Sequence, residues 1–325
     1  MKFGIRFDFR NPAFSGVDMA DRYAAALDMA EWADGRGADD ITLSEHHGSA
    51  DGYLPSALAM AAAFAARTAT AQIDVRAVVA AFHDPLRLAE DAAVVDLLSR
   101  GRLTLTVVGG YVAEEFDMFG VRLADRPARV NESVATLRAA WSGEPFQFRG
   151  RPACVTPRPA QPGGPQIVLG GSSEAAARRA ARIADGFLPA EPRFYEFYRD
   201  ECVKLGRPDP GPYGGADTSV VVVADDPEAA WPVLAPFFLH EVNAYGRWAA
   251  GAVSVGYQPV DSVDALRSFG QYRILTPDQL LAELDRQGES AYVLLHPMVG
   301  GIPPDLAWEH LRLFEKSVLD RGGEG

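Results

Sequence analysis

The stretch IDVRAVVAAFHDPLRLAEDAAVVDLLSRGRLTLTVV, residues 73–108, decides the fold. Residues 73–80 form a nearly continuous apolar run, which is typical of a parallel strand buried on both faces. Residues 85–99 predict a helix, and residues 103–108 predict the next strand. A strand, a helix and a second strand in this order indicate a parallel sheet with a connecting helix.

The remainder of the chain repeats this alternation. We expect strands at residues 3–7, 41–43, 73–80, 103–108, 166–169, 186–188, 219–224 and 292–295. We expect helices at residues 18–34, 55–68, 85–99, 126–141, 173–184, 194–205, 227–245, 277–286 and 304–319. Eight such units favour an α/β protein with one (β/α)8 TIM-barrel domain over residues 1–325. The alternative is two doubly wound halves, but no G-x-G-x-x-G follows the first strand, which weakens the dinucleotide-binding version.

Two segments interrupt the alternation. Residues 146–164 are rich in Pro and Gly and predict a small hairpin insertion. Residues 251–274, after the seventh strand, have no clear period, and we expect them to form a lid over the barrel mouth. Aromatic side chains would make such a lid apolar and would suit a hydrophobic substrate. They are Trp248, Tyr257, Phe269 and Tyr272.

The charge balance argues against several classes of partner. The chain has 31 Lys and Arg against 44 Asp and Glu, a net charge of −13, which does not suit nucleic acid or an anionic membrane surface. Cys154 and Cys202 are far apart and lack metal-ligand spacing, which fits free thiols in a reducing compartment. The first residues lack the apolar stretch of a signal peptide, so we expect a cytoplasmic protein.

A carboxylate and two histidines, Glu45, His46 and His47, follow the second expected strand. In a barrel, the carboxyl ends of the strands carry the active site, so these side chains are candidates for it. A metal site is disfavoured because no H-x-x-x-H or H-E-x-x-H spacing occurs, and we predict no metal. A purely structural pair and an acid/base role remain, and the position favours the acid/base role.

Glycine-rich turns follow two other strands. Gly109, Gly110 and Tyr111 follow the fourth strand, where small residues would let a flat ring approach the backbone. Glu115 is expected to accept a hydrogen bond in the pocket, whereas Glu114 is expected to be solvated. The four residues after the fifth strand form either a phosphate cradle at a helix N-terminus or an ordinary helix cap. They are Gly170, Gly171, Ser172 and Ser173.

The first strand alternates apolar and charged side chains. Period two places Phe3, Ile5 and Phe7 on one face, expected to meet the helices. The charged set is expected to face the barrel interior, where it must be paired, either in ion pairs or against a ligand. That set comprises Arg6, Asp8 and Arg10.

An ordered set of motifs resembles the bacterial luciferase-like flavin-dependent monooxygenase and oxidoreductase superfamily over nearly the whole chain. The motifs are MKFGI, EHH, DPLRLAEDAAVVDLLSRGRL, GGYVAEEFDMFG, GGSSEAAARRAARIADG and GGIPPDLAWEHLRLFEKSV. The resemblance implies a luciferase-like barrel that binds reduced FMN from a separate reductase and uses oxygen to oxygenate a small organic substrate. It also implies a homodimer.

The resemblance further implies roles for single residues. His46 falls at the catalytic position and His47 at its supporting neighbour, while Tyr111 would contact the flavin through its backbone. Ala77 falls beside a non-prolyl cis peptide against the flavin ring. The cofactor-binding positions implied by the whole comparison are Glu45, Ala77, Gly109, Gly110, Tyr111, Gly170, Gly171, Ser172 and Ser173.

The sequence departs from the luciferase pattern at two phosphate-binding positions, where Gly109 replaces an Arg and Gly171 replaces a Glu. Backbone N–H groups and Ser hydroxyls would then hold the phosphate. Arg158, Arg178 or Arg179 would compensate as cations, but for Arg178 and Arg179 solvation on a helix surface is the favoured alternative. One branch of the superfamily uses a deazaflavin for hydride transfer, and a non-catalytic subunit shares the fold. The EHH motif favours FMN, and the presence of its first histidine favours the catalytic type.

Overall fold

The computed structural model describes residues 1–215, 219–250 and 258–322. Within these ranges the main sheet has nine strands, and every pairing in it is parallel. The strands are β1 (Lys2–Phe7), β2 (Asp40–Leu43), β3 (Gln72–Val79), β4 (Leu103–Val108), β7 (Gln166–Gly171), β8 (Gly186–Pro189), β9 (Val220–Val223), β10 (Tyr272–Leu275) and β11 (Tyr292–Leu295). Their order is β10-β9-β11-β1-β2-β3-β4-β7-β8. The predicted α/β class is confirmed.

From β1 to β8 the strand order follows the chain, as in a (β/α)8 barrel. On its other side β1 pairs with β11, so the first and last strands of the sheet are neighbours. The order ends at β8 and β10, and no pairing joins these two strands within the described ranges. The fold is therefore barrel-like, with a parallel sheet that the described pairing does not close.

The ninth strand corrects one expectation. All eight expected strands are present, but β10 lies inside the segment that we expected to be a lid. Its burial alternates, with Tyr272 and Ile274 in the core, and helix α9 (Val263–Phe269) precedes it. The described part of the segment is thus a helix followed by a strand. Both elements are too short to produce a recognisable period of apolar residues in the sequence. Residues 251–257, including Tyr257, lie outside the described residues.

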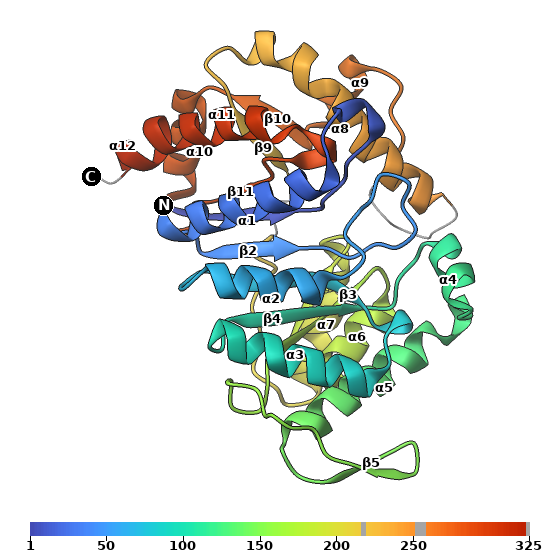
Figure 1. Ribbon diagram of the computed structural model, residues 1–325. Helices are drawn as coiled ribbons and strands as arrows, with labels where there is room; N and C mark the ends of the chain where they lie inside the picture. The colour runs from blue at the N-terminus through green and yellow to red at the C-terminus, as the bar shows by residue number, and fades with distance from the viewer. Residues whose placement is uncertain (216–218, 251–257, 323–325) are drawn as a thin grey trace.

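Helices cover the sheet. They are α1 (Met19–Gly35), α2 (Ala57–Arg67), α3 (Pro85–Ser99), α4 (Ala113–Phe119), α5 (Arg126–Trp141), α6 (Glu174–Ile183), α7 (Arg193–Lys204), α8 (Pro227–Ala249), α10 (Pro277–Gln287), α11 (Pro304–Phe314) and α12 (Asp320–Gly322), in addition to α9. Figure 1 shows α1, α2 and α3 following one another along one side of the sheet, and α4 at the edge of the molecule. None of the described helices is long and apolar enough to cross a membrane.

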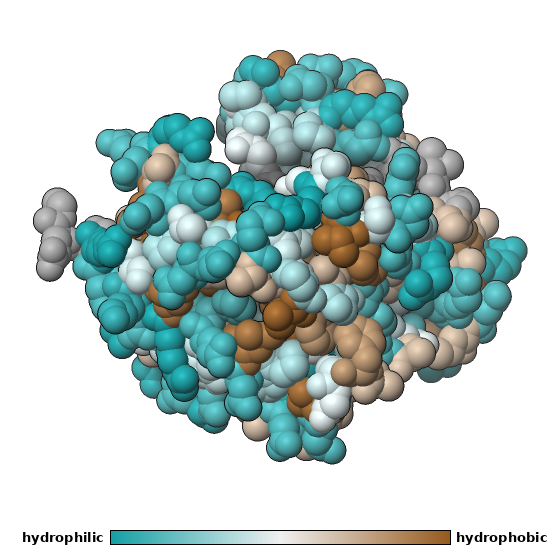
Figure 2. Space-filling model, turned by 90° about the horizontal axis from the view of Figure 1, so that it is seen from above, coloured by the Kyte–Doolittle hydropathy of each residue, from teal (hydrophilic) through white to brown (hydrophobic). Residues whose placement is uncertain are grey.

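The expected hairpin insertion is also present. Strands β5 (Phe146–Phe148) and β6 (Arg151–Ala153) pair antiparallel in a sheet of their own. Seen from above, the molecular surface is mainly hydrophilic, with apolar side chains in separate patches (Figure 2). This surface agrees with the acidic composition of the chain.

The apolar face of β1 packs against the helices, as predicted. The ring of Phe3 lies 6.5 Å from that of Trp32 on α1 and 5.6 Å from that of Phe314 on α11. The ring of Phe7 lies 5.4 Å from that of Phe64 on α2. These contacts fix β1 between the helices and leave its other face for the interior of the sheet.

The charged side chains at the end of β1 are buried and paired, as predicted. The backbone N–H of Arg10 donates to Asp8 Oδ1 at 3.0 Å, and its Nη1 donates to Asp51 Oδ2 at 2.5 Å. His296 approaches Asp8 Oδ2 through Nε2 at 3.6 Å. Burial alone would raise the pKa of Asp8, but His296 and Arg10 lower it to about 2. The network therefore holds its carboxylates ionised beneath the mouth of the sheet.

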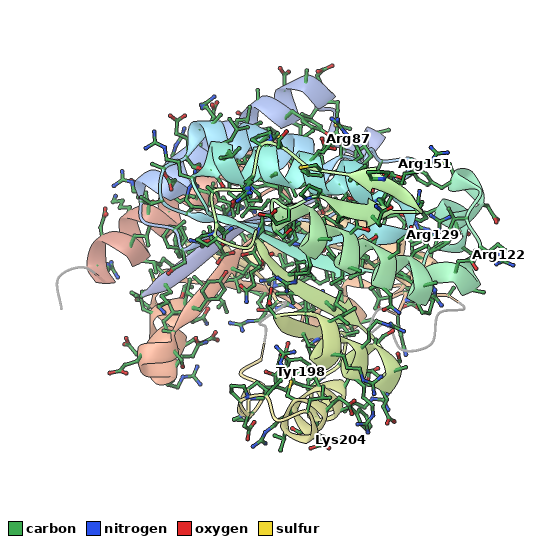
Figure 3. All side chains as sticks on the ribbon, turned by 90° about the horizontal axis from the view of Figure 1, so that it is seen from below. Arg87, Arg122, Arg129, Arg151, Tyr198 and Lys204 are labelled. Atoms are coloured by element: carbon green, nitrogen blue, oxygen red, sulfur yellow. The ribbon has the colours of Figure 1, made fainter. Side chains whose placement is uncertain are left out.

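We expect Arg10→Met to destabilise the protein strongly, because it leaves the buried carboxylates of Asp8 and Asp51 without the guanidinium that pairs with both. Breaking a buried ion pair on one side typically costs about 3–5 kcal/mol in the free energy of unfolding. Arg87→Met is the matched control, because Arg87 on α3 is exposed and pairs only along its own helix (Figure 3). Urea unfolding of both variants measures the difference, and equal stability of the two would contradict the assigned role of Arg10.

Candidate active site

A cavity of about 350 Å³ lies at the carboxyl ends of the strands. Most residues predicted for the site line it, and they come from the ends of β2, β3, β4 and β7. They are Glu45, His46, Ala77, Gly109, Gly110, Tyr111, Gly170, Gly171 and Ser172. The lining does not include His47 or Ser173. The strand-end pattern in the sequence thus brought most of the predicted residues to one cavity, which other residues also line.

His46 is held by a carboxylate from a different element. It is 8% exposed, and its Nδ1–H donates to Glu115 Oε1 on α4 at 2.8 Å. The same oxygen accepts the backbone N–H of His47 at 2.8 Å. Because a carboxylate accepts at Nδ1, the neutral imidazole keeps its lone pair on Nε2, which makes no hydrogen bond to another described residue. The arrangement leaves His46 Nε2 available to accept a proton.

Burial sets the protonation state of His46. Removal from water disfavours the imidazolium and lowers the pKa of His46 below 6.5, although Glu115 opposes this by stabilising the charged form. His46 is therefore mainly neutral at pH 7. A neutral imidazole backed by a carboxylate can take a proton and then be stabilised as the cation, which is the requirement for a general base.

Replacing Glu115 by Gln should lower the pKa of His46 further, because it removes the charge that favours the imidazolium. NMR titration of the His46 ring nitrogens measures this value directly and also reports the tautomer. Glu114→Gln is the control, since Glu114 is the exposed neighbour on α4 and should leave the pKa of His46 unchanged. A pKa that stays constant or rises in Glu115→Gln would show that the two groups are not coupled.

Glu45 fixes the end of β2. Its Oε1 accepts His47 Nε2–H at 2.9 Å, His83 Nε2–H at 3.0 Å and the backbone N–H of Val79 at 3.3 Å. Burial would raise the pKa of Glu45, but the hydrogen bonds from His47 and His83 lower it to about 2. His47 thus braces the loop, while His83 is a partner of Glu45 that the sequence did not identify. These hydrogen bonds fix the end of β2.

Aromatic rings enclose His46. Trp248 stacks on its imidazole with centroids 4.3 Å apart, and Tyr53 meets it edge-on at 4.9 Å. Tyr111 and Tyr245 lie at 5.8 Å and 6.0 Å. The guanidinium of Arg10 lies 4.6 Å from the Trp248 ring and so links the aromatic wall to the buried ion pairs. This wall leaves an apolar surface beside His46.

Of the aromatic residues predicted for the lid, only Trp248 lies at the site within the described ranges. Tyr272 is buried in β10 and donates through its hydroxyl to Glu241 Oε2 at 2.6 Å. Phe269 ends α9 and is 40% exposed. The prediction for these two residues was wrong, because they belong to a helix and a strand that the sequence did not reveal.

Packing and backbone conformation require glycine at two positions of the cavity. A Cβ at Gly170 would lie 2.5 Å from Val108 Cγ1, so no larger residue fits there without movement. Gly110 has a φ of +80°, which favours glycine. The expected non-prolyl cis peptide is present between Arg76 and Ala77, and both residues line the cavity.

The two serines at the start of α6 have different surroundings. Ser173 is the N-cap, and its Oγ accepts the backbone N–H of Ala176 at 3.2 Å. Ser172 lines the cavity instead. Because a helix N-terminus presents unpaired N–H groups and a partial positive charge, this end of the cavity suits an anion.

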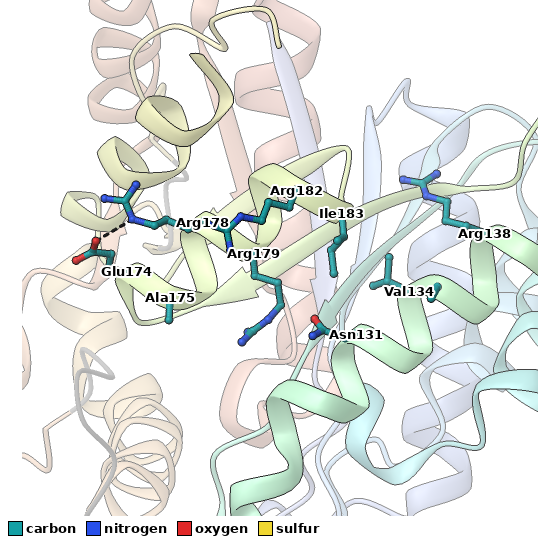
Figure 4. A pocket seen from close by; sticks show the side chains of 10 residues that line it. Asn131, Val134, Arg138, Glu174, Ala175, Arg178, Arg179, Arg182 and Ile183 are labelled. Atoms are coloured by element: carbon teal, nitrogen blue, oxygen red, sulfur yellow. Dashed lines mark hydrogen bonds and ion pairs between the residues drawn. The ribbon is translucent and has the colours of Figure 1, made fainter. Parts of the chain in front are cut away.

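The arginines expected to compensate for Gly109 lie elsewhere. Arg178 and Arg179 line a separate groove of about 1050 Å³ between α5 and α6 (Figure 4). Arg178 is paired there with Glu174 and Glu201, while Arg158 donates to the Gly143 carbonyl at 2.8 Å. None of the three arginines lines the cavity at the strand ends, and Arg178 and Arg179 lie on the helix surface, as the alternative expected.

The cavity has the features that a reduced flavin requires. Its volume falls within the range of small-molecule sites, roughly 300–1,000 Å³. The N-terminus of α6 offers donors for a phosphate, and His46 supplies a proton-transfer group. The residues present therefore fit a flavin with a phosphorylated side chain.

The sequence match agrees with this geometry. The family profile of the luciferase-like monooxygenases matches residues 1–283. The chain therefore belongs to the luciferase-like monooxygenase family, whose members are oxidoreductases.

Individual relatives have moderate sequence identity to this chain, between 25% and 34% for the three described below. The chain is 30% identical over 189 residues to an F420-dependent glucose-6-phosphate dehydrogenase of Amycolatopsis mediterranei, covering 54% of this chain and 56% of that one. It is 34% identical over 127 residues to an FMNH2-dependent dimethylsulfone monooxygenase of Pseudomonas fluorescens, covering 37% and 35%. The chain thus spans about half or less of the length of these curated relatives. The crystal structure of monooxygenase RslO1 from Streptomyces bottropensis matches with a TM-score of 0.76 and 25% identity, covering 99% of each chain.

Proposed function

We propose that the protein is a flavin-dependent monooxygenase that uses reduced FMN and oxygen to oxygenate a small, hydrophobic organic substrate. The observation that carries the proposal is one cavity with a helix N-terminus for a phosphate at one end and the His46–Glu115 pair in its wall. The full-length structural match to a monooxygenase supports oxygenation.

Each part of the cavity has a defined task in this proposal. The start of α6 and Ser172 would hold the phosphate, and Gly109, Gly110 and Gly170 would lie against the ring. A bound reduced flavin supplies the electrons that activate oxygen. His46 Nε2 takes a proton at the reacting end, and Glu115 stabilises the imidazolium that results.

The apolar wall suggests the substrate class. Tyr53, Tyr111, Tyr245 and Trp248 surround His46 and would bury an apolar molecule. The absence of a dinucleotide fingerprint after the first strand fits a separate reductase that delivers reduced FMN. We further propose that the protein is a homodimer in the cytoplasm.

A second candidate function is hydride transfer with a deazaflavin. The relative that supports it is the F420-dependent dehydrogenase, which aligns with 54% of this chain. A neutral His46 would then accept the proton of a substrate hydroxyl as hydride leaves its carbon. The same cavity and the same base serve both reactions, so the cofactor decides between them.

The test supplies reduced FMN from an added reductase and screens ketones, sulfones and aromatic compounds under isotopically labelled oxygen. Incorporation of one labelled oxygen atom into a product, dependent on the protein, supports the monooxygenase. If alcohols reduce F420 in the presence of the protein and no compound acquires labelled oxygen, the second candidate is correct and the first is wrong.

A further inference from the structure

We infer that Asp8, Glu241 and His296 bind a structural divalent cation, with Zn²⁺ the best match to their donor atoms. The residues come from separate elements, since Asp8 follows β1, Glu241 lies on α8 and His296 follows β11. One ligand atom from each lies within 4.8 Å of the other two, and each residue is at most 2% exposed. The sequence predicted no metal because ligands so far apart in the chain form no recognisable motif.

His296 lies between the two carboxylates without a hydrogen bond to either. Its Nε2 is 3.6 Å from Asp8 Oδ2, and its Nδ1 is 3.9 Å from Glu241 Oε1. Both ring nitrogens and Asp8 Oδ2 are buried and make no hydrogen bond to a described residue. Because buried polar atoms are almost always satisfied by protein, water or an ion, this group of atoms points to a bound ligand.

The separations favour a metal ion over a proton shared within the cluster. A direct N–H···O bond from an imidazolium to a carboxylate is about 2.7–2.9 Å long, so a protonated His296 would draw its partners closer. A Zn²⁺ ion with bonds of about 2.0–2.2 Å holds its ligand atoms roughly 3–4 Å apart. One ring nitrogen would bind the ion while the other N–H faces a carboxylate, which is the usual arrangement of a histidine ligand.

The second oxygen of each carboxylate is already held. Asp8 Oδ1 accepts the backbone N–H of Arg10 at 3.0 Å, and Glu241 Oε2 accepts the hydroxyl of Tyr272 at 2.6 Å. These bonds fix both carboxylates with one oxygen turned toward His296. Contacts of this kind orient the ligands of a metal and raise its affinity. A set of one imidazole and two carboxylates suits Zn²⁺.

The charges in the cluster favour a cation as the ligand. Arg10 is shared between two carboxylates, with Nη1 2.5 Å from Asp51 Oδ2 and Nε 3.8 Å from Asp8 Oδ2. Arg22 instead directs both of its Nη groups to backbone carbonyls. With neutral imidazoles, the carboxylates of Asp8, Asp51 and Glu241 carry three negative charges against the single positive charge of Arg10. A divalent cation would compensate the remaining two.

A bound ion would tie α8 to the sheet. Strands β1 and β11 are neighbours, and Glu241 would join α8 to the ends of both. Helix α8 also carries Tyr245 and Trp248, whose rings lie beside His46. None of the three ligands lines the cavity of His46. The ion would therefore hold the aromatic wall of that cavity in place from behind.

The test measures the metal content and the Zn²⁺ binding of the whole, untagged protein. Mass spectrometry of protein purified without chelators should find about one Zn²⁺ per chain, since folding and metal binding are coupled. Dialysis against EDTA should lower the thermal unfolding temperature, and Zn²⁺ should restore it, because an ion that binds only the folded state stabilises that state. Co²⁺ in place of Zn²⁺ should give the visible absorption bands of an ion with nitrogen and oxygen ligands.

Two variants remove a ligand with little change in size. Glu241→Gln and His296→Gln should each weaken Zn²⁺ binding by at least about 10- to 100-fold, a loss typical even for a residue that only supports a ligand. His310→Gln is the matched control and should retain Zn²⁺ like the wild type. His310 donates through Nδ1–H to the Val223 carbonyl at 2.8 Å and belongs to no metal-ligand group among the described residues.

Wild-type protein that holds no metal, gains no thermal stability from Zn²⁺ and gives no Co²⁺ bands overturns the inference. Zn²⁺ binding of wild-type affinity in both ligand variants also overturns it, because the ion is then bound elsewhere. If a variant does not fold, the effects of Zn²⁺ and Co²⁺ on the wild type decide. None of these results depends on flavin binding, so the proposed function is tested separately.

Discussion

His46→Ala is expected to bind reduced FMN within a few-fold of the wild-type affinity and to lose oxygenation. Its ring is buried among aromatic side chains and bonded to Glu115, whereas the proposed phosphate site is at the start of α6. Removing a positioned acid/base group typically costs about 100- to 10,000-fold in rate. The measurement is oxygenated product formed per reduced FMN supplied, together with the hydrogen peroxide released.

His47→Ala is the neighbouring control. Its ring holds Glu45 rather than facing the cavity, so this variant should lose much less activity than His46→Ala. In His46→Ala the electrons of the reduced cofactor should appear as hydrogen peroxide instead of product. If the His46→Ala enzyme turns over at the wild-type rate, His46 and His47 have a structural role and His46 is not the acid/base group.

Ser172→Asp is expected to weaken binding of reduced FMN sharply. Ser172 lines the cavity at the start of α6, so the new carboxylate would lie close to the phosphate. Two like charges about 4 Å apart near a protein surface repel by roughly 4 kcal/mol, and partial screening leaves about a 30- to 1,000-fold loss of affinity.

Ser172→Asn separates the charge from the size of the new side chain, because it is nearly isosteric with Asp and neutral. It should lose at most a few-fold of the affinity. Anaerobic titration of both variants with reduced FMN and reduced riboflavin gives the comparison. Equal affinities of Ser172→Asp and Ser172→Asn for reduced FMN would place the phosphate elsewhere.

Much of the fold could be predicted because the strands and helices differ in period. The ranges 85–99 and 126–141 match α3 and α5 residue for residue, since each helix begins at or beside a proline and has regular apolar spacing. The strand β10 could not be predicted. Four residues with alternating burial, between the helices α9 and α10, do not stand out in a single sequence.

The site was predictable where it depends on strand ends and was missed where it depends on packing. His46 and the glycines after β4 and β7 are visible because a parallel sheet brings its strand ends together. The hydrogen bond between His46 and Glu115 joins positions 69 residues apart. The sequence predicted Glu115 as an acceptor in the pocket but did not identify His46 as its partner. Arg126 also lines the cavity and was missed because it reads as the start of an ordinary helix, and its contact with Gly109 exists only in three dimensions.

Anaerobic competition between reduced FMN and reduced F420 for the purified protein tests the proposal that this cavity binds reduced FMN. We expect reduced FMN to bind at least about tenfold more tightly, a difference of roughly 1.4 kcal/mol. Tight binding of reduced F420, with reduced FMN unable to displace it, would instead make the protein a deazaflavin-dependent oxidoreductase.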